Sequence, residues 1–473
     1  MRAFVLDRPA TALLLFSTAV QLLVVAAISW RAGGVDAYAF SSLDAKEYYQ
    51  LALNLRNELS FSMADQEPFD PDFWRVPGYP LFMAISMLFL PRDPLTPLLA
   101  NHALSLINPL LLFWIIRRDL GPARALLVAG VFSLDPFRLF YANWLLATTL
   151  FTTVCLLCWW ATLRLTLTKI AKPWQAMLVG ALCGIAILIR PISILFPLGL
   201  ALAMVLGRNA GPTEATAGSA SNIGVHWWKR LVPVGLVGGS AAIVVLPWLL
   251  RNYMLMGAFA LSNQSGVVLA YFKATEVVLW SEGRTQDRFR ETSLNKDRLD
   301  EPHLVWDTID QKLQARVQDV DQRVREQLTW TNLAQGNRSS ENSFAVSAAL
   351  SRIGIEMLWE RPVATAACLV SRMGALLSFP LLLAVGGMGQ TLSASQWMLG
   401  AGYAMLSLLA AIQAIRRISL ASTLVPLAIV ICLLLATTPQ LDPRFRVPLT
   451  PMLLYLAATI TVTRTGGHEC DDR

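Results

Sequence analysis

Charged residues are scarce in this chain: Asp, Glu, Lys and Arg make up only 15% of its 473 residues, whereas 55% of the residues are hydrophobic. This composition leaves too little polar surface for a water-soluble domain. Histidine is scarcer still, and the spacing of His102, His226, His303 and His468 gives no metal-binding cluster. The scarcity of charge therefore indicates a membrane protein, and the sequence predicts no metal site.

Cysteine is too sparse to build a disulfide framework. Five of the six cysteines lie in apolar runs, and only Cys470 lies in a polar tail. Cys155 and Cys158 have the spacing of a redox or metal motif, but no histidine or second cysteine pair lies near them in the sequence. We therefore expect both thiols to be packing residues.

Long apolar runs, by contrast, recur along the whole chain. A helix of about 20 apolar residues crosses the roughly 30 Å of hydrocarbon in a bilayer. Eleven such runs lie near residues 10–30, 97–116, 121–137, 141–164, 174–189, 191–207, 230–250, 362–386, 396–415, 420–437 and 447–463. The sequence therefore predicts an all-α polytopic membrane protein with about 10–11 transmembrane helices. The pair Gly180 and Gly184 predicts close helix packing in the fifth run.

The positions of the basic residues predict the orientation, because Lys and Arg are enriched in short cytoplasmic loops. Arg8, Arg117 and Arg416 all fall inside if the N-terminus is inside. We ascribe the net charge of +7 to this bias and not to nucleic-acid binding. On this assignment the run 362–386 would begin and end outside, so it is a broken or interfacial element or one boundary is wrong.

Two polar stretches are expected outside the membrane. In the loop 31–96, residues 44–57 have the spacing of an amphipathic helix, and the apolar piece 79–90 is too short to cross. In the second stretch, apolar residues recur every three or four positions between Trp306 and Leu328, which predicts one long amphipathic helix. We expect three parts, namely an N-terminal transmembrane catalytic module (1–251), an extracytoplasmic loop region (252–360) and a C-terminal transmembrane segment (361–473).

Several arginines lie at the outer ends of the predicted spans, against the usual charge bias. They are Arg75, Arg190, Arg251, Arg444 and Arg446. A guanidinium group is planar and permanently charged, and it matches the oxygen atoms of a phosphate. These arginines are therefore candidates to bind a phosphate-bearing lipid. An arginine at a helix end can also extend to the lipid headgroups, and this alternative stays open for Arg444 and Arg446.

One carboxylate shares the first outer loop with Arg75. Asp44 could act on a substrate, but it also lies three residues after Ser41 and three before Glu47. Both spacings fit a helix capping box, in which side chains bond the free backbone N–H groups of the first turn. Spacing alone favours a cap as the role of Asp44.

An ordered set of short motifs resembles a known family. It comprises Asp44-Ala45-x-x-Tyr48, Arg75-x-Pro77-Gly78-Tyr79-Pro80, Gly184-x-Ala186-x-Leu188-x-Arg190-Pro191, Leu246-Pro247-Trp248-Leu249-Leu250-Arg251-Asn252-Tyr253 and Arg444-Phe445-Arg446-Val447-Pro448. The set resembles the GT-C superfamily of integral membrane glycosyltransferases, in the bacterial branch related to the protein O-mannosyltransferases and the lipid A aminoarabinose transferase. It extends from residue 1 to about residue 460.

This resemblance implies an inverting transfer of a sugar from a polyprenyl-phosphate donor to a glycolipid, polysaccharide or protein acceptor. The reaction would take place on the extracytoplasmic face of the bacterial inner membrane. The family pattern gives Asp44 the role of general base or acceptor-positioning group. It assigns the binding of the donor phosphate to five arginines, namely Arg75, Arg190, Arg251, Arg444 and Arg446. It assigns the positioning of the substrate to Tyr48, Tyr79 and Asn252.

The chain departs from the family pattern at Thr148, where many bacterial relatives carry an acidic residue. This difference puts a bound metal ion or a second carboxylate in doubt, and the sequence does not require a divalent metal. Two other functions stay open. A transporter or flippase of lipid-linked saccharides should show charges near mid-membrane and repeated halves. The other alternative is a non-catalytic scaffold with the same fold. The absence of an acidic residue at Thr148 is the observation that favours it most.

Overall fold

The computed structural model describes residues 7–34, 38–40, 42–88, 93–168, 172–208, 227–283, 316, 322, 343–378, 394–417, 420–438 and 443–459. The helices in this part are α1 (Arg8–Ala32), α3 (Leu43–Glu58), α4 (Gly78–Ser86), α5 (Leu95–Leu120), α6 (Pro122–Ser133), α7 (Pro136–Ala142), α8 (Thr148–Leu167), α9 (Pro173–Ile189), η1 (Pro191–Leu195), α10 (Phe196–Arg208), α11 (Trp227–Met256), α12 (Gln264–Val267), η2 (Val268–Ala274), α13 (Thr275–Ser281), α18 (Ser343–Trp359), α19 (Pro362–Ser378), α21 (Ala394–Arg416), α22 (Ala421–Thr437), η4 (Pro443–Phe445) and α23 (Thr450–Ala458). Among these residues the only β pairing is an isolated bridge between Ser62 and Pro71. The predicted all-α class is confirmed.

Each of the eleven predicted apolar runs contains a helix. Four helices, α1, α5, α8 and α11, are long and apolar enough to cross a membrane by length and composition. The pair α6 and α7, bent by 55°, would make a fifth span. The remaining apolar helices, including α9, α19 and α22, are shorter. The protein is therefore a multi-pass membrane protein, and the total of 10–11 spans stays a prediction.

Helix ends follow the capping signals in the sequence. Asp7 caps α1 by accepting a hydrogen bond from the backbone N–H of Ala10 at 3.1 Å. Asp135 caps α7 in the same way, through the N–H of Arg138 at 2.8 Å. Proline stands in the first turn of α6 and α9, where it costs no helical hydrogen bond. Local signals thus break the apolar sequence into separate helices.

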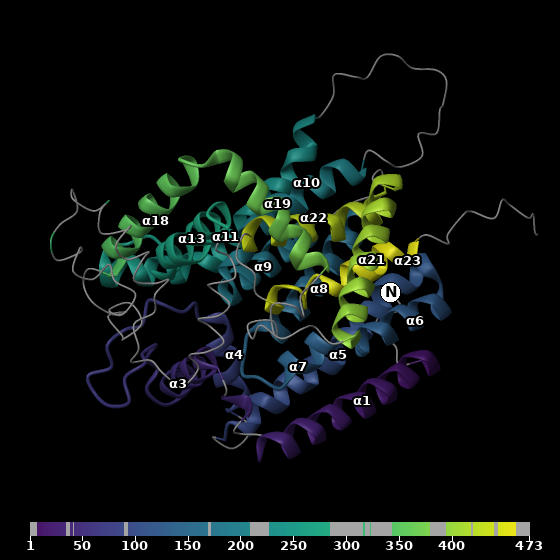
Figure 1. Ribbon diagram of the computed structural model, residues 1–473, viewed down its shortest axis with the longest axis horizontal. Coiled ribbons are helices and arrows are strands. Elements are labelled where there is room, and N and C mark those ends of the chain that lie inside the picture. The colour runs from purple at the N-terminus through teal and green to yellow at the C-terminus, as the bar shows by residue number, and fades with distance from the viewer. Residues whose placement is uncertain are drawn as a thin grey trace, which may run out of the picture.

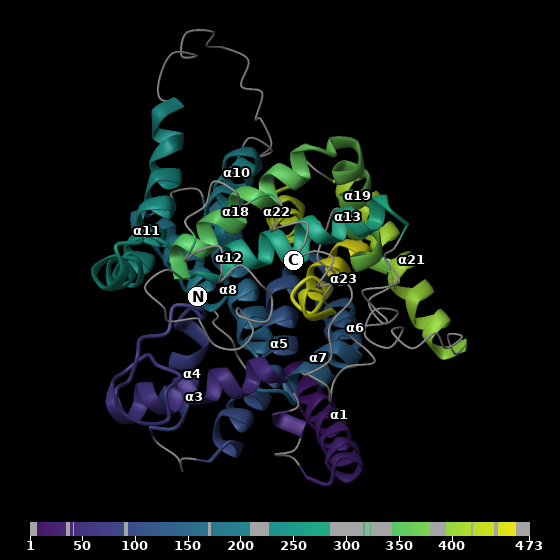
Figure 2. The ribbon, with the colours of Figure 1, turned by 60° about the vertical axis from the view of Figure 1, so that its left-hand side comes forward.

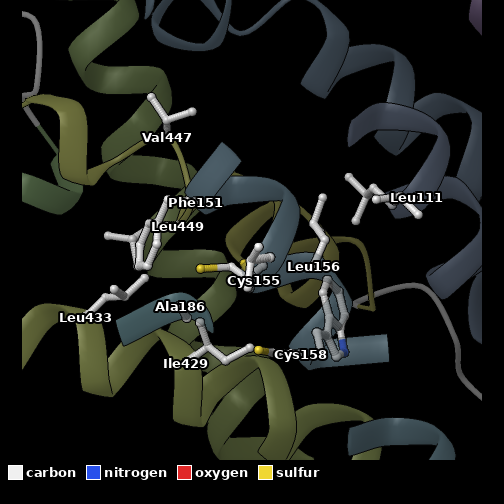
Figure 3. Close-up of a cluster of buried hydrophobic side chains, with 14 of the residues drawn as sticks. Leu111, Phe151, Cys155, Leu156, Cys158, Ala186, Ile429, Leu433, Val447 and Leu449 are labelled. Atoms are coloured by element: carbon white, nitrogen blue, oxygen red, sulfur yellow. The ribbon is translucent and has the colours of Figure 1, made fainter. Parts of the chain in front are cut away.

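The core lies where α5, α8, α9, α22 and the segment before α23 meet (Figure 3). Phe151 and Cys155 of α8 point toward Leu433 of α22 and Leu449. Cys155 and Cys158 are fully buried among apolar side chains, as the sequence predicts. The middle of the bundle is therefore packed with hydrophobic side chains.

Helices α9 and α11 pack backbone against backbone. A Cβ atom at Gly180 would lie 2.1 Å from the carbonyl oxygen of Val237, and one at Gly184 would lie 2.9 Å from that of Ala241. Real Cβ atoms do not approach other atoms so closely, so only glycine fits at Gly180. The close packing predicted from these two glycines is confirmed.

Helices α3 and α4 lie at one side of the molecule, together with α13 and α18, whereas α6 and α23 lie at the opposite side (Figure 1). Helices α3 and α4 match the two helices predicted for residues 44–57 and 79–90. The start of α4 presses on the end of α9, because a Cβ atom at Gly78 would lie 2.6 Å from the carbonyl oxygen of Leu188. This contact brings the loop before α4 next to Arg190.

A second layer forms from residues on either side of the long loop. Helix α12 packs directly on α18, since a Cβ atom at Gly266 would lie 2.0 Å from the carbonyl oxygen of Ser347. Tyr271 and Leu350 are buried between these segments. The long amphipathic helix predicted between Trp306 and Leu328 falls outside the described residues, apart from isolated positions. The three-part division of the chain stays a prediction.

Helix α1 stands at the edge of the bundle, where it packs on α5 and α6 (Figure 2). Many of its side chains are exposed, including Leu15 at 67% and Leu22 at 63%. In a membrane protein, exposed leucines on a long apolar helix face lipid. Helix α1 therefore represents a lipid-facing span, with which other exposed helices can be compared.

Candidate functional site

A short loop held by Asp72 presents Arg75 to the bundle. The Asp72 carboxylate accepts hydrogen bonds from the backbone N–H groups of Trp74 at 3.1 Å and Arg75 at 3.0 Å. The backbone N–H of Asp72 donates to the carbonyl of Phe61 at 2.8 Å. Because these bonds fix the backbone on both sides of Asp72, the direction of the Arg75 side chain is set by the loop.

Arg75 binds two carboxylates on one face of α3. Its Nε donates to Glu47 Oε2 at 2.8 Å, its Nη2 donates to Asp44 Oδ1 at 2.6 Å, and Nη2 also contacts Glu47 Oε2. Asp44 and Glu47 are three positions apart on the helix, so their side chains lie side by side. Arg75 and Glu47 are buried, at 8% and 4% exposure. Arg75 and Glu47 are therefore largely shielded from solvent.

Arg444 contacts the same aspartate from the far end of the chain. Its Nη1 donates to Asp44 Oδ2 at 2.6 Å. Each oxygen of the Asp44 carboxylate therefore binds a different guanidinium group. The side chains of Asp44 and Arg444 are both 27% exposed, whereas that of Arg75 is 9% exposed. Arg444 is thus the partner that a ligand can reach.

The two arginines determine the ionisation of Asp44. Burial alone would raise the pKa of this carboxyl, but the charges and hydrogen bonds of Arg75 and Arg444 outweigh burial and hold the pKa well below its usual range. Burial likewise opposes the charge of Arg75, yet Asp44, Tyr48 and Glu47 raise the pKa of its guanidinium. Asp44 and Arg75 are therefore ionised at every physiological pH.

Asp44 does not cap α3. The helix begins at Leu43, its N-cap residue is Ser42, and no side chain caps it. Asp44 lies inside the first turn, with its carboxylate turned to Arg75 and Arg444. The capping interpretation favoured by spacing alone is wrong, because the arginines come from segments remote in sequence.

Arg190 occupies the turn between α9 and η1. Its backbone is extended, with φ of −146°, and its Nη2 donates to Thr148 Oγ1 at 2.8 Å. The guanidinium lies 5.7 Å from the ring centres of both Phe151 and Phe445. Phe445 adjoins Arg444 in the chain, so the turn containing η4 brings Arg444 and Arg190 to the same end of the bundle. We call this end, with α3, α4, the Arg190 turn and η4, the site end.

Tyr48 and Tyr79 pack beside the charges. The Arg75 guanidinium lies 5.0 Å from the centre of the Tyr48 ring, which meets the Tyr79 ring edge-on at 5.1 Å. The Tyr79 hydroxyl accepts a hydrogen bond from Asn101 Nδ2 at 2.9 Å. Burial raises the pKa of Tyr79, so its hydroxyl stays protonated. The two rings form an aromatic wall next to Arg75.

Arg251 and Asn252 bind backbone carbonyl groups and do not face the site. Arg251 Nη1 donates to the Asp72 carbonyl at 3.0 Å and to Asn252 Oδ1 at 2.9 Å, and its guanidinium stacks 4.6 Å from the ring of Trp248. Asn252 Nδ2 donates to the carbonyl of Ala260 at 2.8 Å. The structure therefore does not bring these two residues to Asp44, and their contacts support the loop that carries Arg75.

Arg446 lies two residues after Arg444 and is fully buried. Its Nη1 donates to the carbonyls of Leu376 at 3.0 Å and Leu377 at 2.6 Å. Its guanidinium lies 3.9 Å from the centre of the Tyr403 ring, and the Tyr403 hydroxyl donates to Asp135 Oδ2 at 3.1 Å. Arg446 thus ties the η4 turn to α19, α21 and α7.

Sequence reasoning missed three partners of the predicted residues. The amphipathic spacing of residues 44–57 predicts that Glu47 lies on the polar face of that helix, yet it is buried against Arg75. Its position three residues after Asp44 is the signal that places both carboxylates on one face. Asp72 and Tyr403 carried no such signal, because their roles depend on contacts between distant segments.

The residues at the site do not fit a divalent metal ion. Both oxygens of Asp44 bind guanidinium groups, and Thr148 Oγ1 binds Arg190. Within the described part of the chain, no group of three His, Cys, Asp or Glu side chains is close enough to hold a metal. A cation at Asp44 would have to displace Arg75 or Arg444.

The arrangement favours an anion. The formal charges of Asp44, Glu47, Arg75 and Arg444 cancel, and Arg190 adds one positive charge beside them. Guanidinium groups bind phosphate oxygens through short, charge-assisted hydrogen bonds. A phosphate that reached Arg444 and Arg190 would therefore meet a net positive charge while a carboxylate stayed in place beside it.

No family model matches the chain, and no curated protein matches it. Two crystal structures of ArnT from Cupriavidus metallidurans are similar to it, each with 13% sequence identity. The form bound to undecaprenyl phosphate matches over 94% of this chain and 78% of that chain with a TM-score of 0.39. The apo form matches over 95% and 76% with a TM-score of 0.38. This degree of likeness transfers no residue role to the chain, so the roles below depend on the geometry of the site.

Proposed function

We propose that this protein transfers a sugar from a polyprenyl-phosphate donor to an acceptor at the membrane surface. The observation that supports this function is the Asp44 carboxylate held between Arg75 and Arg444 at one end of an apolar helical bundle. A carboxylate beside a phosphate-binding cation supplies what glycosyl transfer needs. One group faces the attacking acceptor, and the other faces the departing phosphate.

Arg444 and Arg190 are the proposed phosphate contacts. Negative charge builds up on the phosphate as the bond from the sugar carbon to the phosphate oxygen breaks, and the electron pair of that bond leaves with the oxygen. Cations already in place stabilise this charge more in the transition state than in the ground state. Arg75 is bound to Glu47 and more buried, so we assign it to positioning Asp44.

Asp44 is proposed to accept a hydrogen bond from the acceptor hydroxyl and then its proton. While Arg75 and Arg444 both bind Asp44, its pKa is too low for an efficient base, since proton transfer works best when the pKa of the base is near the operating pH. When the donor phosphate binds Arg444, Asp44 loses one of its two stabilising cations. The pKa of Asp44 then rises. The donor therefore activates the base that the second substrate needs.

The reaction is a single displacement. The acceptor oxygen forms a bond to the anomeric carbon while the phosphate departs from the opposite face, so the configuration inverts. The hydroxyl proton passes to Asp44, and the sugar-free carrier phosphate stays paired with arginine. The motif set and the membrane spans favour the extracytoplasmic face of a bacterial inner membrane as the place of this reaction.

The test compares glycolipids and surface polysaccharides, by mass, from matched cells that carry wild-type protein, no protein, Asp44→Asn or Asp7→Asn. Asp7 is a matched control because it pairs with Arg117 at 3.1 Å, away from the site end. We expect one sugar to disappear in the null and Asp44→Asn strains and to persist with Asp7→Asn, at equal protein abundance. A wild-type profile from a normally abundant Asp44→Asn protein would reject the proposal and favour a transporter or a scaffold.

A further inference from the structure

Helix α19 is tied at one end to α13 and at the other end to the η4 turn of the site end. Helix α13 also belongs next to this end, because its residues share a buried cluster with Trp74, the neighbour of Arg75. Before its first turn, Arg361 Nη1 donates to Ser281 Oγ at the end of α13, at 3.0 Å. At its last turn, the carbonyls of Leu376 and Leu377 accept hydrogen bonds from Arg446, two residues from Arg444. A helix that crossed the bilayer would have its two ends on opposite sides.

The middle of α19 is held to the same elements. Arg372 forms an ion pair with Glu276 of α13, with a nitrogen to oxygen distance of 2.5 Å. Cys368 and Leu376, four positions to either side of Arg372, are fully buried. This face of the helix therefore packs on the protein from Cys368 to Leu376.

The opposite face of α19 is apolar and exposed. Val363 is 81% exposed and Val370 is 71% exposed, with Ala366 also exposed between them. Trp359, at the end of α18, continues this stripe with 76% exposure. We call Trp359, Val363, Ala366 and Val370 the α19 stripe. Side chains at this spacing share one face of a helix.

We infer that α19 does not cross the bilayer but lies in its interfacial layer at the site end, with the α19 stripe in lipid. An amphipathic helix in this position buries its apolar face at the boundary between headgroups and acyl chains. Tryptophan is enriched at the same depth. The helix has 17 residues, which is the short end of the range for a span.

Neighbouring surface identifies lipid as the occupant. Helix α19 packs against α21, whose exposed side chains include Met405 and Leu408 at 61% each and Ile415 at 74%. The α19 stripe is therefore next to the exposed apolar surface of α21. An interfacial α19 also removes the conflict in the predicted orientation, because its ends then lie on one side without an odd crossing.

A measurement of the depth of the α19 stripe in the bilayer tests this inference. Nitroxide labels are attached one at a time at Val363, Ala366 and Val370 through cysteine substitution in the full chain, in lipid nanodiscs, with Cys470→Ser. The other five cysteines are buried. Accessibility to oxygen, which partitions into lipid, is compared with accessibility to a water-soluble nickel chelate. We expect the same shallow depth at all three positions.

Helix α1 supplies the matched control. Leu15 and Leu22 are exposed and have the same sequence separation as Val363 and Val370. Along an upright helix this separation amounts to about 10 Å of depth. A similar depth difference between Val363 and Val370 would overturn the inference and make α19 a span. Labels shielded from both reagents would show that a second copy covers the stripe, and labels open to the chelate alone would show that water does. Neither result would bear on sugar transfer.

Discussion

The Asp44 carboxylate accepts a hydrogen bond from Arg444, 400 residues further along the chain. This contact closes a site that α3 and the Arg75 loop begin. Because Arg75 binds the other oxygen of the same carboxylate, the charge of Asp44 is neutralised within the protein. A phosphate ligand must therefore compete with Asp44 for Arg444, and the predictions below depend on this competition.

The ion pairs of Asp44 predict how the variant Asp44→Asn responds to pH. The folded-state pKa of Asp44 lies below that of the unfolded chain, so the pairs stabilise the protein at every pH above the unfolded value of about 3.9. This contribution is lost only as the pH falls toward the folded pKa. The difference in melting temperature between wild type and Asp44→Asn should be constant from about pH 5 to 8 and shrink below about pH 4. A difference that already shrinks near pH 6 would mean that Asp44 titrates there.

Replacement of Arg444 should weaken the binding of the carrier phosphate. A hydrogen bond to a charged group contributes about 1.5–3 kcal/mol, so Arg444→Ala should reduce affinity for undecaprenyl phosphate by about 10- to 100-fold. Arg444→Lys should recover part of this loss, because it restores the charge without the planar fork. Binding to purified protein in nanodiscs measures both effects. Arg124→Ala, at an exposed arginine at the start of α6, should bind as wild type; equal losses in both variants would indicate only a general charge effect.

Glu47 should matter for stability more than for chemistry. It is buried against Arg75, and removal of one partner from a buried ion pair costs about 3–5 kcal/mol. Glu47→Gln keeps a hydrogen-bond acceptor, so the loss should be smaller, about 1–3 kcal/mol. Thermal unfolding in detergent should show a lower melting temperature than wild type. An unchanged melting temperature would show that Arg75 does not depend on Glu47.

Thr148 tests whether Arg190 faces the phosphate. In Thr148→Glu the new carboxylate would pair with Arg190 and cancel the positive charge that we assign to the donor. Affinity for undecaprenyl phosphate should fall. Thr148→Val removes only the hydroxyl that accepts from Arg190, with little change in shape, and should leave most of the affinity. Tighter phosphate binding by Thr148→Glu would contradict the proposed role of Arg190.

Tyr403 should act at a distance by positioning the η4 turn. Tyr403→Phe removes the hydrogen bond to Asp135 but keeps the ring against Arg446. A hydrogen bond to a charged group is worth about 1.5–3 kcal/mol, and the part of this loss that displaces the η4 turn should raise the KM for the donor by about 2- to 10-fold. The kcat at saturating donor should change less. A lower kcat with an unchanged KM would instead implicate Tyr403 in the chemical step.

The fold class was predictable from sequence because burial in lipid requires long, uninterrupted apolar helices. The ranges 95–120 and 421–437 agree closely with the predicted runs near 97–116 and 420–437. Close packing of α9 on α11 was predictable for a similar local reason, since two glycines one turn apart leave a groove. Such features depend on residues near one another in sequence.

The side-chain pairings of the site were not predictable, because they join segments far apart in the chain. Arginines at helix ends could be recognised as a set, but nothing in the sequence separates Arg444, which reaches Asp44, from Arg251, which binds the Asp72 carbonyl. Both have a positive charge at the end of an apolar run. The distinction depends on the tertiary path of the loop before α4.

The contact between residues 44 and 444 also affects how the protein is made. Synthesis proceeds from the N-terminus, so α3 and the Arg75 loop are outside the ribosome long before η4 exists. During that interval Asp44 and Glu47 share Arg75, and together with Arg190 the partial site has no net formal charge. Arg444 supplies the net positive charge that the proposed function needs. On that proposal, the site attracts phosphate only after the η4 turn has been made.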